Sequence, residues 1–325
     1  MTNAFDLTWT LDGITMEGTF VCPAGDGPFT AVVLVAGSGP TDRDWCSPLV
    51  PGNNGSGRLL AEAFADAGIA SLRYDKRASG THAMENAEKL IGRMSMQSHL
   101  NELVAAIATL SQQACVDTSR IFGLGHSEGT LHVLHYATTP RDIPLAGIVL
   151  AGPPGRPIQE VLLSQLALQA AQNPGNPDLM TQVKKAAARY AAGQQMNPDS
   201  SLPDSIKMVL AGFEAPANLP FARELWIESA SDSLAKVQIP VLVLIGAKDL
   251  QVDMHADGTP LQEATAGMTH ITFSFPANAN HVFKEDLRTL AEIAAAPGSG
   301  FNEPGTRLDP ESLETILTGL SHAGA

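Results

Sequence analysis

Gly125-His126-Ser127-Glu128-Gly129 lies between a short apolar segment, residues 119–124, and a segment of helical character, residues 130–137. A Gly-x-Ser-x-Gly sequence between a buried strand and a helix is typical of a tight turn that lifts the serine hydroxyl out of a sheet. Only glycine fits two residues before and after such a serine, which explains Gly125 and Gly129. The pattern therefore predicts Ser127 as a nucleophile at the carboxyl end of a buried strand.

Charge and composition restrict the classes of partner. The chain has 325 residues, 20 of them basic and 34 acidic, and its formal net charge is −14. Nucleic-acid binding needs a basic face, so this balance excludes a general nucleic-acid binder, and it disfavours docking on anionic membranes. Hydrophobic residues make up 44% and charged residues 17%, which is typical of a globular protein.

The sequence also bears on location and cofactors. The first seven residues have neither a basic segment nor an apolar one, and the chain has no run of eighteen apolar residues, so we expect a cytoplasmic protein without a membrane span. Cys22, Cys46 and Cys115 are odd in number and widely spaced, which predicts neither a disulfide framework nor a zinc site. We expect no metal and no cofactor.

Apolar strands alternate with helices along most of the chain. Residues 5–11 and 14–21 flank Asp12-Gly13, which predicts a hairpin. Further strands are expected at 30–35, 69–74, 147–151, 241–245 and 270–275, and helices at 58–67, 98–113 and 310–320. Continuous apolar strands separated by helices indicate an α/β protein with a mostly parallel sheet covered on both faces.

This alternation stops between Ala151 and Val237. Four helical segments replace it, at 158–172, 177–192, 203–211 and 219–234. We therefore expect a core made of residues 1–151 and 237–325, and a helical cap made of residues 152–236. Most apolar residues of the cap should pack against one another. A stripe of the 158–172 segment is nevertheless expected to face the serine and select substrates by apolar fit, namely Val161, Leu162, Gln165, Leu168 and Gln169. Replacing Leu162 or Leu166 by alanine should then shift the preferred substrate size, so both leucines are expected to lie toward the serine.

A serine hydroxyl needs a base, and the base needs an orienting carboxylate. In proteins with this type of turn the chain order is Ser, then an acid, then His. Asp249 follows the 241–245 strand and His281 follows the 270–275 strand, so both should lie at the same edge of the sheet as Ser127. Asp253 is the alternative acid.

Two backbone N–H groups are expected to stabilise the developing oxyanion. The first belongs to Glu128, the residue after the nucleophile, and the second to the loop after the 30–35 strand. Gly37-Ser38-Gly39 is that loop, and Ser38 is the candidate donor.

Several segments together resemble the bacterial α/β-hydrolase carboxylesterases. They are Ala-Gly-Ser-Gly-Pro-Thr-Asp-Arg-Asp at 36–44, Leu-Arg-Tyr-Asp-Lys-Arg at 72–77, the Gly-His-Ser-Glu-Gly turn, residues 239–252, and Asn280-His281. The resemblance spans residues 30–284 apart from the cap. It implies the α/β-hydrolase fold, with Ser127 as nucleophile, Asp249 as acid and His281 as base.

The chain departs from this family at two loops. Ala36 replaces the histidine that usually opens the oxyanion segment, and Ala78-Ser79-Gly80 replaces the usual Gly-x-Gly. The charged residues near these loops are expected to form an ion network under the site, without a catalytic role. They are Asp42, Arg43, Asp44, Asp75 and Arg77.

Together these features predict a serine hydrolase that cleaves small to medium carboxylic esters through an acyl-enzyme. The same residues also suit a thioesterase, an amidase or peptidase, a carbon–carbon bond hydrolase or an acyltransferase. An alternative from another functional class is a non-catalytic ligand receptor with the same fold. Such receptors tend to lose members of the serine, acid and histidine triad. A small-molecule ester is the expected partner, and a homodimer is left open.

Overall fold

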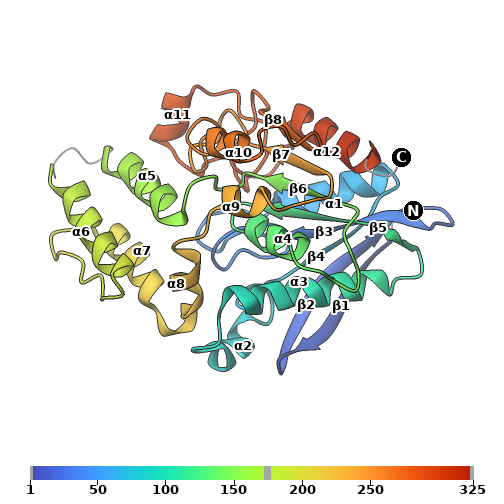
Figure 1. Ribbon diagram of the computed structural model, residues 1–325, viewed down its shortest axis with the longest axis horizontal. Helices are drawn as coiled ribbons and strands as arrows, with labels where there is room; N and C mark the ends of the chain where they lie inside the picture. Colours follow the sequence, from blue (N-terminus) through green and yellow to red (C-terminus); the bar gives the residue numbers. More distant parts are fainter. Residues whose placement is uncertain (1–2, 172–176, 323–325) are drawn as a thin grey trace.

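A single eight-stranded sheet forms the centre of the molecule (Figure 1). The structure is a computed structural model that describes residues 3–171 and 177–322. The strands are β1 Asn3–Leu11, β2 Ile14–Cys22, β3 Phe29–Val35, β4 Ala70–Tyr74, β5 Val116–His126, β6 Gly147–Ala151, β7 Val241–Leu244 and β8 Ile271–Ser274. Their order across the sheet is β1-β2-β4-β3-β5-β6-β7-β8.

The sheet is mostly parallel, as predicted. β1 and β2 form an antiparallel hairpin, β2 is antiparallel to β4, and every pair from β4 to β8 is parallel. The hairpin turns at Asp12 and Gly13, whose φ angles are 52° and 78°. Two consecutive positive φ angles suit a two-residue hairpin turn, and Asp-Gly is one of the few dipeptides that adopt them readily.

Helices cover both faces of the sheet. Their bounds are α1 Ser56–Asp66, α2 Ala83–Leu90, α3 Met96–Ser111, α4 Gly129–Ala137, α5 Ile158–Ala171, α6 Leu179–Ala191, α7 Asp204–Glu214, the 3₁₀ helix η1 Pro216–Asn218, α8 Phe221–Leu225, α9 Ala230–Leu234, α10 Gly258–Ala264, α11 Leu290–Ala295 and α12 Pro310–His322. Within the described ranges, none of these helices combines the length and the apolar character that a membrane span requires.

β3 shows how its side chains divide between the two faces. Ala31, Val33 and Val35 pack in a core with α3, α4 and α9, whereas Val32 and Leu34 pack in a second core with α1 and α12. Successive strand residues point to opposite faces, so a continuous apolar run is what a strand buried on both sides requires.

The predicted elements are confirmed with small shifts at their ends, with two exceptions. The expected helix over 219–234 is two short helices, α8 and α9, and the end of the 158–172 segment lies outside the described residues. Helices α2, α10 and α11 were not predicted. They have six to eight residues, too few for a helical repeat to stand out in the sequence.

The segment between β6 and β7 forms a helical layer with its own core. Helices α5, α6 and α7 lie at one end of the long axis, and the two termini lie near the other end (Figure 1). Leu162 and Leu166 of α5 pack against residues of α6 and α7 and against Trp226. The expectation that these two leucines face the serine is therefore wrong, because they are part of the core of this helical layer.

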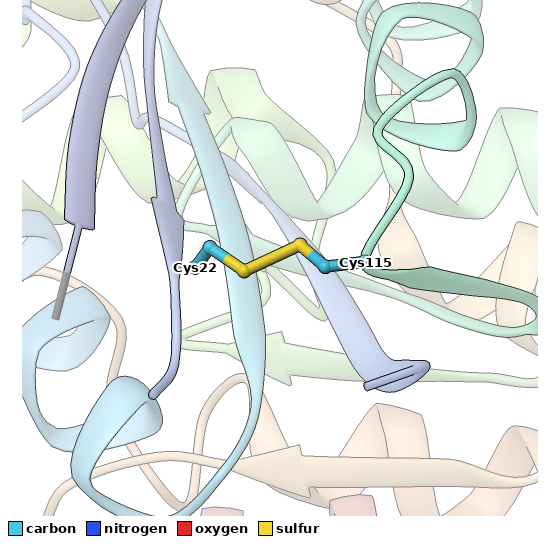
Figure 2. The surroundings of a disulfide bond; sticks show 2 residues. All are labelled: Cys22 and Cys115. Carbon is cyan, nitrogen blue, oxygen red and sulfur yellow. A yellow bond between two sulfur atoms is a disulfide. The ribbon is translucent and has the colours of Figure 1, made fainter. Parts of the chain in front are cut away.

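The cysteines require a correction. Cys22 at the end of β2 and Cys115 just before β5 form a disulfide across 93 residues of sequence (Figure 2). Parallel pairing of β3 with β5 places Phe29 opposite Val116, and the Phe29 amide donates to the Cys115 carbonyl at 2.7 Å. Tertiary pairing thus brings together two cysteines whose spacing gives no disulfide signal. Cys46 is a free, buried thiol.

The expected ion network is divided into three separate groups of ion pairs. Arg43 pairs with Asp75 and Glu17, each at 2.8–2.9 Å, while Arg73 pairs with Asp44 at 2.7 Å. Arg77 instead contacts Glu102 of α3, and Asp42 accepts backbone amides of its own loop.

Candidate active site

Ser127 occupies a sharp turn between β5 and α4. Its φ of 51° lies in the left-handed region, which a side chain other than that of glycine rarely adopts. A Cβ atom on Gly129 would lie 2.5 Å from the Val35 carbonyl oxygen, and one on Gly125 would lie 2.5 Å from the Gly129 oxygen. Both positions therefore require glycine, and the close approach holds Ser127 against the end of β3.

Asp249 and His281 meet at the same edge of the sheet. Asp249 follows β7 and His281 follows β8, and His281 Nδ1 lies 2.7 Å from Asp249 Oδ2. Both residues are buried. The other carboxylate oxygen, Oδ1, accepts the amides of Gln251 at 2.7 Å and Val252 at 3.0 Å. A carboxylate only accepts hydrogen bonds, so His281 carries its proton on Nδ1 and leaves Nε2 free to act as a base.

Ser127 is linked to this pair through the backbone. Its amide donates to the Ala151 carbonyl at 2.8 Å. A Cβ atom on the next residue, Gly152, would lie 3.7 Å from both Asp249 Oδ2 and His281 Nδ1. In the part of the chain that the structure describes, the Ser127 hydroxyl has no hydrogen-bond partner within 3.5 Å. Such nucleophile–base contacts commonly tighten only in the substrate complex.

His126 supports the loop that carries His281. Its Nε2 lies 2.9 Å from the His281 carbonyl oxygen, to which it donates, and its ring stacks on Trp45 with centroids 4.7 Å apart. Burial, with a smaller contribution from the neighbouring His281, lowers the pKa of His126 to about 3. His126 is therefore neutral near pH 7 and acts as a hydrogen-bond donor to the loop.

The two predicted oxyanion donors flank the serine. Gly37 precedes Ser38, and a Cβ atom on it would lie 3.1 Å from Ser127 Cβ, so the loop lies against the turn. The Thr41 hydroxyl donates to the Ser38 carbonyl at 2.7 Å. Among the described residues, neither the Ser38 amide nor the Glu128 amide donates to a backbone or side-chain acceptor.

The contacts of the Lys76 side chain with Gly37 and with the Glu128 side chain are not predicted by the sequence. Lys76 follows β4, and its ammonium donates to the Gly37 carbonyl at 2.5 Å and to Glu128 Oε1 at 3.1 Å. Both side chains are at most 5% exposed. Burial opposes the charged form of Glu128, yet the Lys76 ammonium and His132 outweigh burial and hold the pKa of that carboxyl below its usual range.

Asp253, the alternative acid, has other partners. The Asp253 carboxylate accepts the amides of His255 and Ala256 at 2.9 and 2.7 Å, and His281 is paired with Asp249 instead. Within residues 3–171 and 177–322, no group of three His, Cys, Asp or Glu side chains is placed to hold a metal ion.

Comparison with known proteins agrees with this architecture. A family model described as serine aminopeptidase, S33, matches residues 54–283. Esterase EstD of Thermotoga maritima is 29% identical over 244 residues, which are 75% of this chain and 52% of that protein. The chain thus spans about half the length of this curated relative.

Solved structures share the fold at low identity. A lipase in its open form superposes with a TM-score of 0.60 at 16% identity, covering 99% of each chain. Proline iminopeptidase of Mycobacterium smegmatis superposes with a TM-score of 0.55 at 16% identity, covering 98% of each chain. The fold predicted from the sequence is confirmed by these likenesses, and the family match over residues 54–283 means that the chain belongs to the serine aminopeptidase S33 family of α/β hydrolases.

Proposed function

We propose that this protein is a serine hydrolase that cleaves carboxylic esters of small molecules through an acyl-enzyme. The proposal rests mainly on the 2.7 Å contact between His281 Nδ1 and Asp249 Oδ2, beside a serine held in a strained turn. Backbone strain at a buried edge of a sheet is typical of functional sites. The similarity to esterase EstD supports an ester as the substrate.

In the acylation step, Ser127 Oγ attacks the ester carbonyl carbon while its proton moves to His281 Nε2. The carbonyl oxygen becomes an oxyanion, which accepts the Ser38 and Glu128 amides. Asp249 stabilises the imidazolium that forms and keeps its Nδ1 protonated. When the tetrahedral intermediate collapses, the alcohol oxygen takes the proton from Nε2 and leaves.

Deacylation repeats these steps with water as the nucleophile. His281 Nε2 removes a proton from the water while the oxygen attacks the acyl carbon. The second tetrahedral intermediate expels Ser127 Oγ, which recovers its proton from Nε2, and the carboxylic acid departs. No cofactor enters either half-reaction.

The helical segment 152–236 is proposed to cap the site of a core formed by residues 1–151 and 237–325. It leaves the sheet after β6, at the edge that carries Asp249 and His281. Gln165 of α5 donates to the Gln251 carbonyl at 3.3 Å, two residues beyond Asp249. Arg156 pairs with the buried Asp257 at 2.9 Å, which ties the base of the cap to the core.

A peptidase is the second candidate because the family model is described as an aminopeptidase. An aminopeptidase needs an acidic group near the reacting carbonyl to bind the substrate ammonium. Two buried carboxylates of the site are already paired, Asp249 with His281 and Glu128 with Lys76. Neither of these two carboxylates is therefore left to bind a substrate ammonium, and the similarity to esterase EstD supports the ester as the first candidate.

Active-site labelling and a substrate panel test the proposal. A fluorophosphonate probe should label wild-type protein stoichiometrically and leave Ser127→Ala unlabelled. p-Nitrophenyl esters of graded chain length should be hydrolysed faster than matched thioesters, anilides and aminoacyl anilides. Loss of a triad serine typically lowers kcat by about 10⁶-fold, so Ser127→Ala activity within tenfold of wild type would refute the assignment. Faster turnover of the aminoacyl anilides would favour the peptidase.

A further inference from the structure

We infer that Lys76 is a positioning residue that holds both backbone donors of the oxyanion hole in place. The inference rests on the proposed function, because it assumes that the Ser38 and Glu128 amides bind an oxyanion. It concerns a side chain that contacts both donor segments.

The contact with Gly37 fixes the orientation of the first donor. The Gly37 carbonyl and the Ser38 N–H belong to the same peptide unit, which is planar and trans, so they point in opposite directions. The Lys76 ammonium lies 2.5 Å from the Gly37 oxygen and thereby sets the direction of the Ser38 N–H. A charge-assisted bond to that oxygen also polarises the peptide and strengthens its N–H as a donor.

The contact with Glu128 fixes the second donor. Lys76 Nζ lies 3.1 Å from Glu128 Oε1, and His132 Nε2 lies 3.4 Å from the same oxygen. Burial lowers the pKa of His132 to about 4 despite the nearby carboxylate, so His132 is a neutral donor near pH 7. Glu128 is thus held at both its side chain and its turn, and its amide is fixed beside Ser127.

One ammonium therefore joins two loops that are distant in sequence, the β3 loop and the β5–α4 turn. The Ser38 side chain is exposed, and Glu128 precedes α4 without a side-chain cap. The role of an oxyanion hole depends on donors that are already oriented before the reaction. A shared anchor keeps the two donors at a constant separation.

A neighbouring ion pair provides a matched control. Arg77 and Glu102 are also buried and in contact, but Arg77 donates to the Ser98 carbonyl and does not touch Gly37 or Glu128. Removing either pair should disturb the fold by a similar amount. Only the pair made by Lys76 should affect stabilisation of the transition state.

The test compares Lys76→Met with Arg77→Met, and Glu128→Gln with Glu102→Gln, on p-nitrophenyl butyrate. Removal of one oxyanion donor lowers kcat by about 10²–10³-fold. A donor that is displaced but still present should cost less kcat than a donor that is removed. We therefore expect Lys76→Met to lower kcat roughly 10- to 100-fold, with KM within about threefold of the wild-type value. Inhibition by a trifluoromethyl ketone, which forms the tetrahedral adduct, should weaken in the same proportion. Arg77→Met should keep kcat within about threefold.

A double variant and a folding control complete the design. If one clamp acts on both loops, Lys76→Met/Glu128→Gln should lose no more kcat than Lys76→Met alone. If Lys76→Met does not fold, the isosteric Glu128→Gln decides, since it should lower kcat more than Glu102→Gln does. The inference is overturned if Lys76→Met leaves kcat unchanged or changes KM alone. The proposed function survives that result, provided that the wild-type activity depends on Ser127. Absence of that wild-type activity overturns the proposed function itself.

Discussion

The replacement Asp249→Asn should nearly abolish turnover while leaving the fold intact. The Oδ1 oxygen of Asp249 accepts two backbone amides, from Gln251 and Val252. In the asparagine variant these two donors will retain the remaining carbonyl oxygen at the same place. The amide NH₂ must then face His281 Nδ1, where the carboxylate Oδ2 lies at 2.7 Å in the wild type.

This exchange reverses the tautomer of His281. An NH₂ group donates, so Nδ1 must accept and the ring proton moves to Nε2, which can then no longer remove a proton from Ser127. The equivalent change in the chymotrypsin-type triad lowers kcat by about 10⁴-fold. A factor of 10⁴ corresponds to about 5 kcal/mol of activation free energy. We expect a loss of this size, with KM little changed.

The assay is steady-state hydrolysis of p-nitrophenyl butyrate, with thermal unfolding as a check on the fold. Asp253→Asn is the matched control, because Asp253 accepts only the His255 and Ala256 amides and an asparagine oxygen can do the same. Its kcat should stay within about threefold of wild type. Asp249→Asn activity within tenfold of wild type, or a larger loss in Asp253→Asn, would refute the assignment of the acid.

Three further predictions concern stability. Gly129→Ala places a methyl 2.5 Å from the Val35 oxygen, so it should lower the free energy of unfolding in urea by about 1–3 kcal/mol or more and lower kcat; unchanged values for both would contradict the close packing at the turn. Leu166, which is 1% exposed, lies in the core of the helical layer, so Leu166→Ala leaves a cavity there. This change should lower the free energy of unfolding, measured by thermal unfolding, by about 2–5 kcal/mol, while turnover of p-nitrophenyl acetate persists. An altered chain-length profile without loss of stability would instead place this leucine at the substrate. The pKa values of His126 and His132, about 3 and about 4, lie below the usual 6.5, so between pH 6.5 and 4 the unfolded chain binds protons that the folded protein excludes. Stability should therefore fall as the pH falls through this window, by about 1.4 kcal/mol per pH unit for each histidine, and urea unfolding should show a smaller fall in His132→Gln; equal stability at pH 7 and 5 would argue against buried neutral rings.

The local pattern of apolar residues in the sequence was sufficient to predict most of the strands and helices. The strands read from continuous apolar runs, such as 30–35 and 147–151, differ from β3 and β6 by at most one residue at an end. Each of these strands is buried on both faces, so its composition carries the signal without help from distant residues. The short helices α10 and α11 were missed because their position depends on packing over the core rather than on a long repeat.

The residues of the candidate site could be predicted from the sequence, but the contacts that hold them in place could not. The turn at Ser127 and the chain order of an acid and a histidine predict Asp249 and His281, and the structure brings these two side chains into contact. Their catalytic roles stay predictions. Lys76 lies in a charged segment that reads as an ordinary strand end, so nothing local marks it as the partner of Gly37 and Glu128.

The sequence by itself determined the order of strands and helices, the strained turn at Ser127, and the positions of Asp249 and His281 after two strands. These depend on apolar periodicity and on glycine, which act within a few residues. Tertiary structure alone decided the Cys22–Cys115 pairing, the inward packing of Leu166, and the burial of Lys76 between two loops. Each of these contacts joins segments far apart in the chain, and their partners are set by how the strands align in the sheet and how the helices pack, which no local pattern encodes.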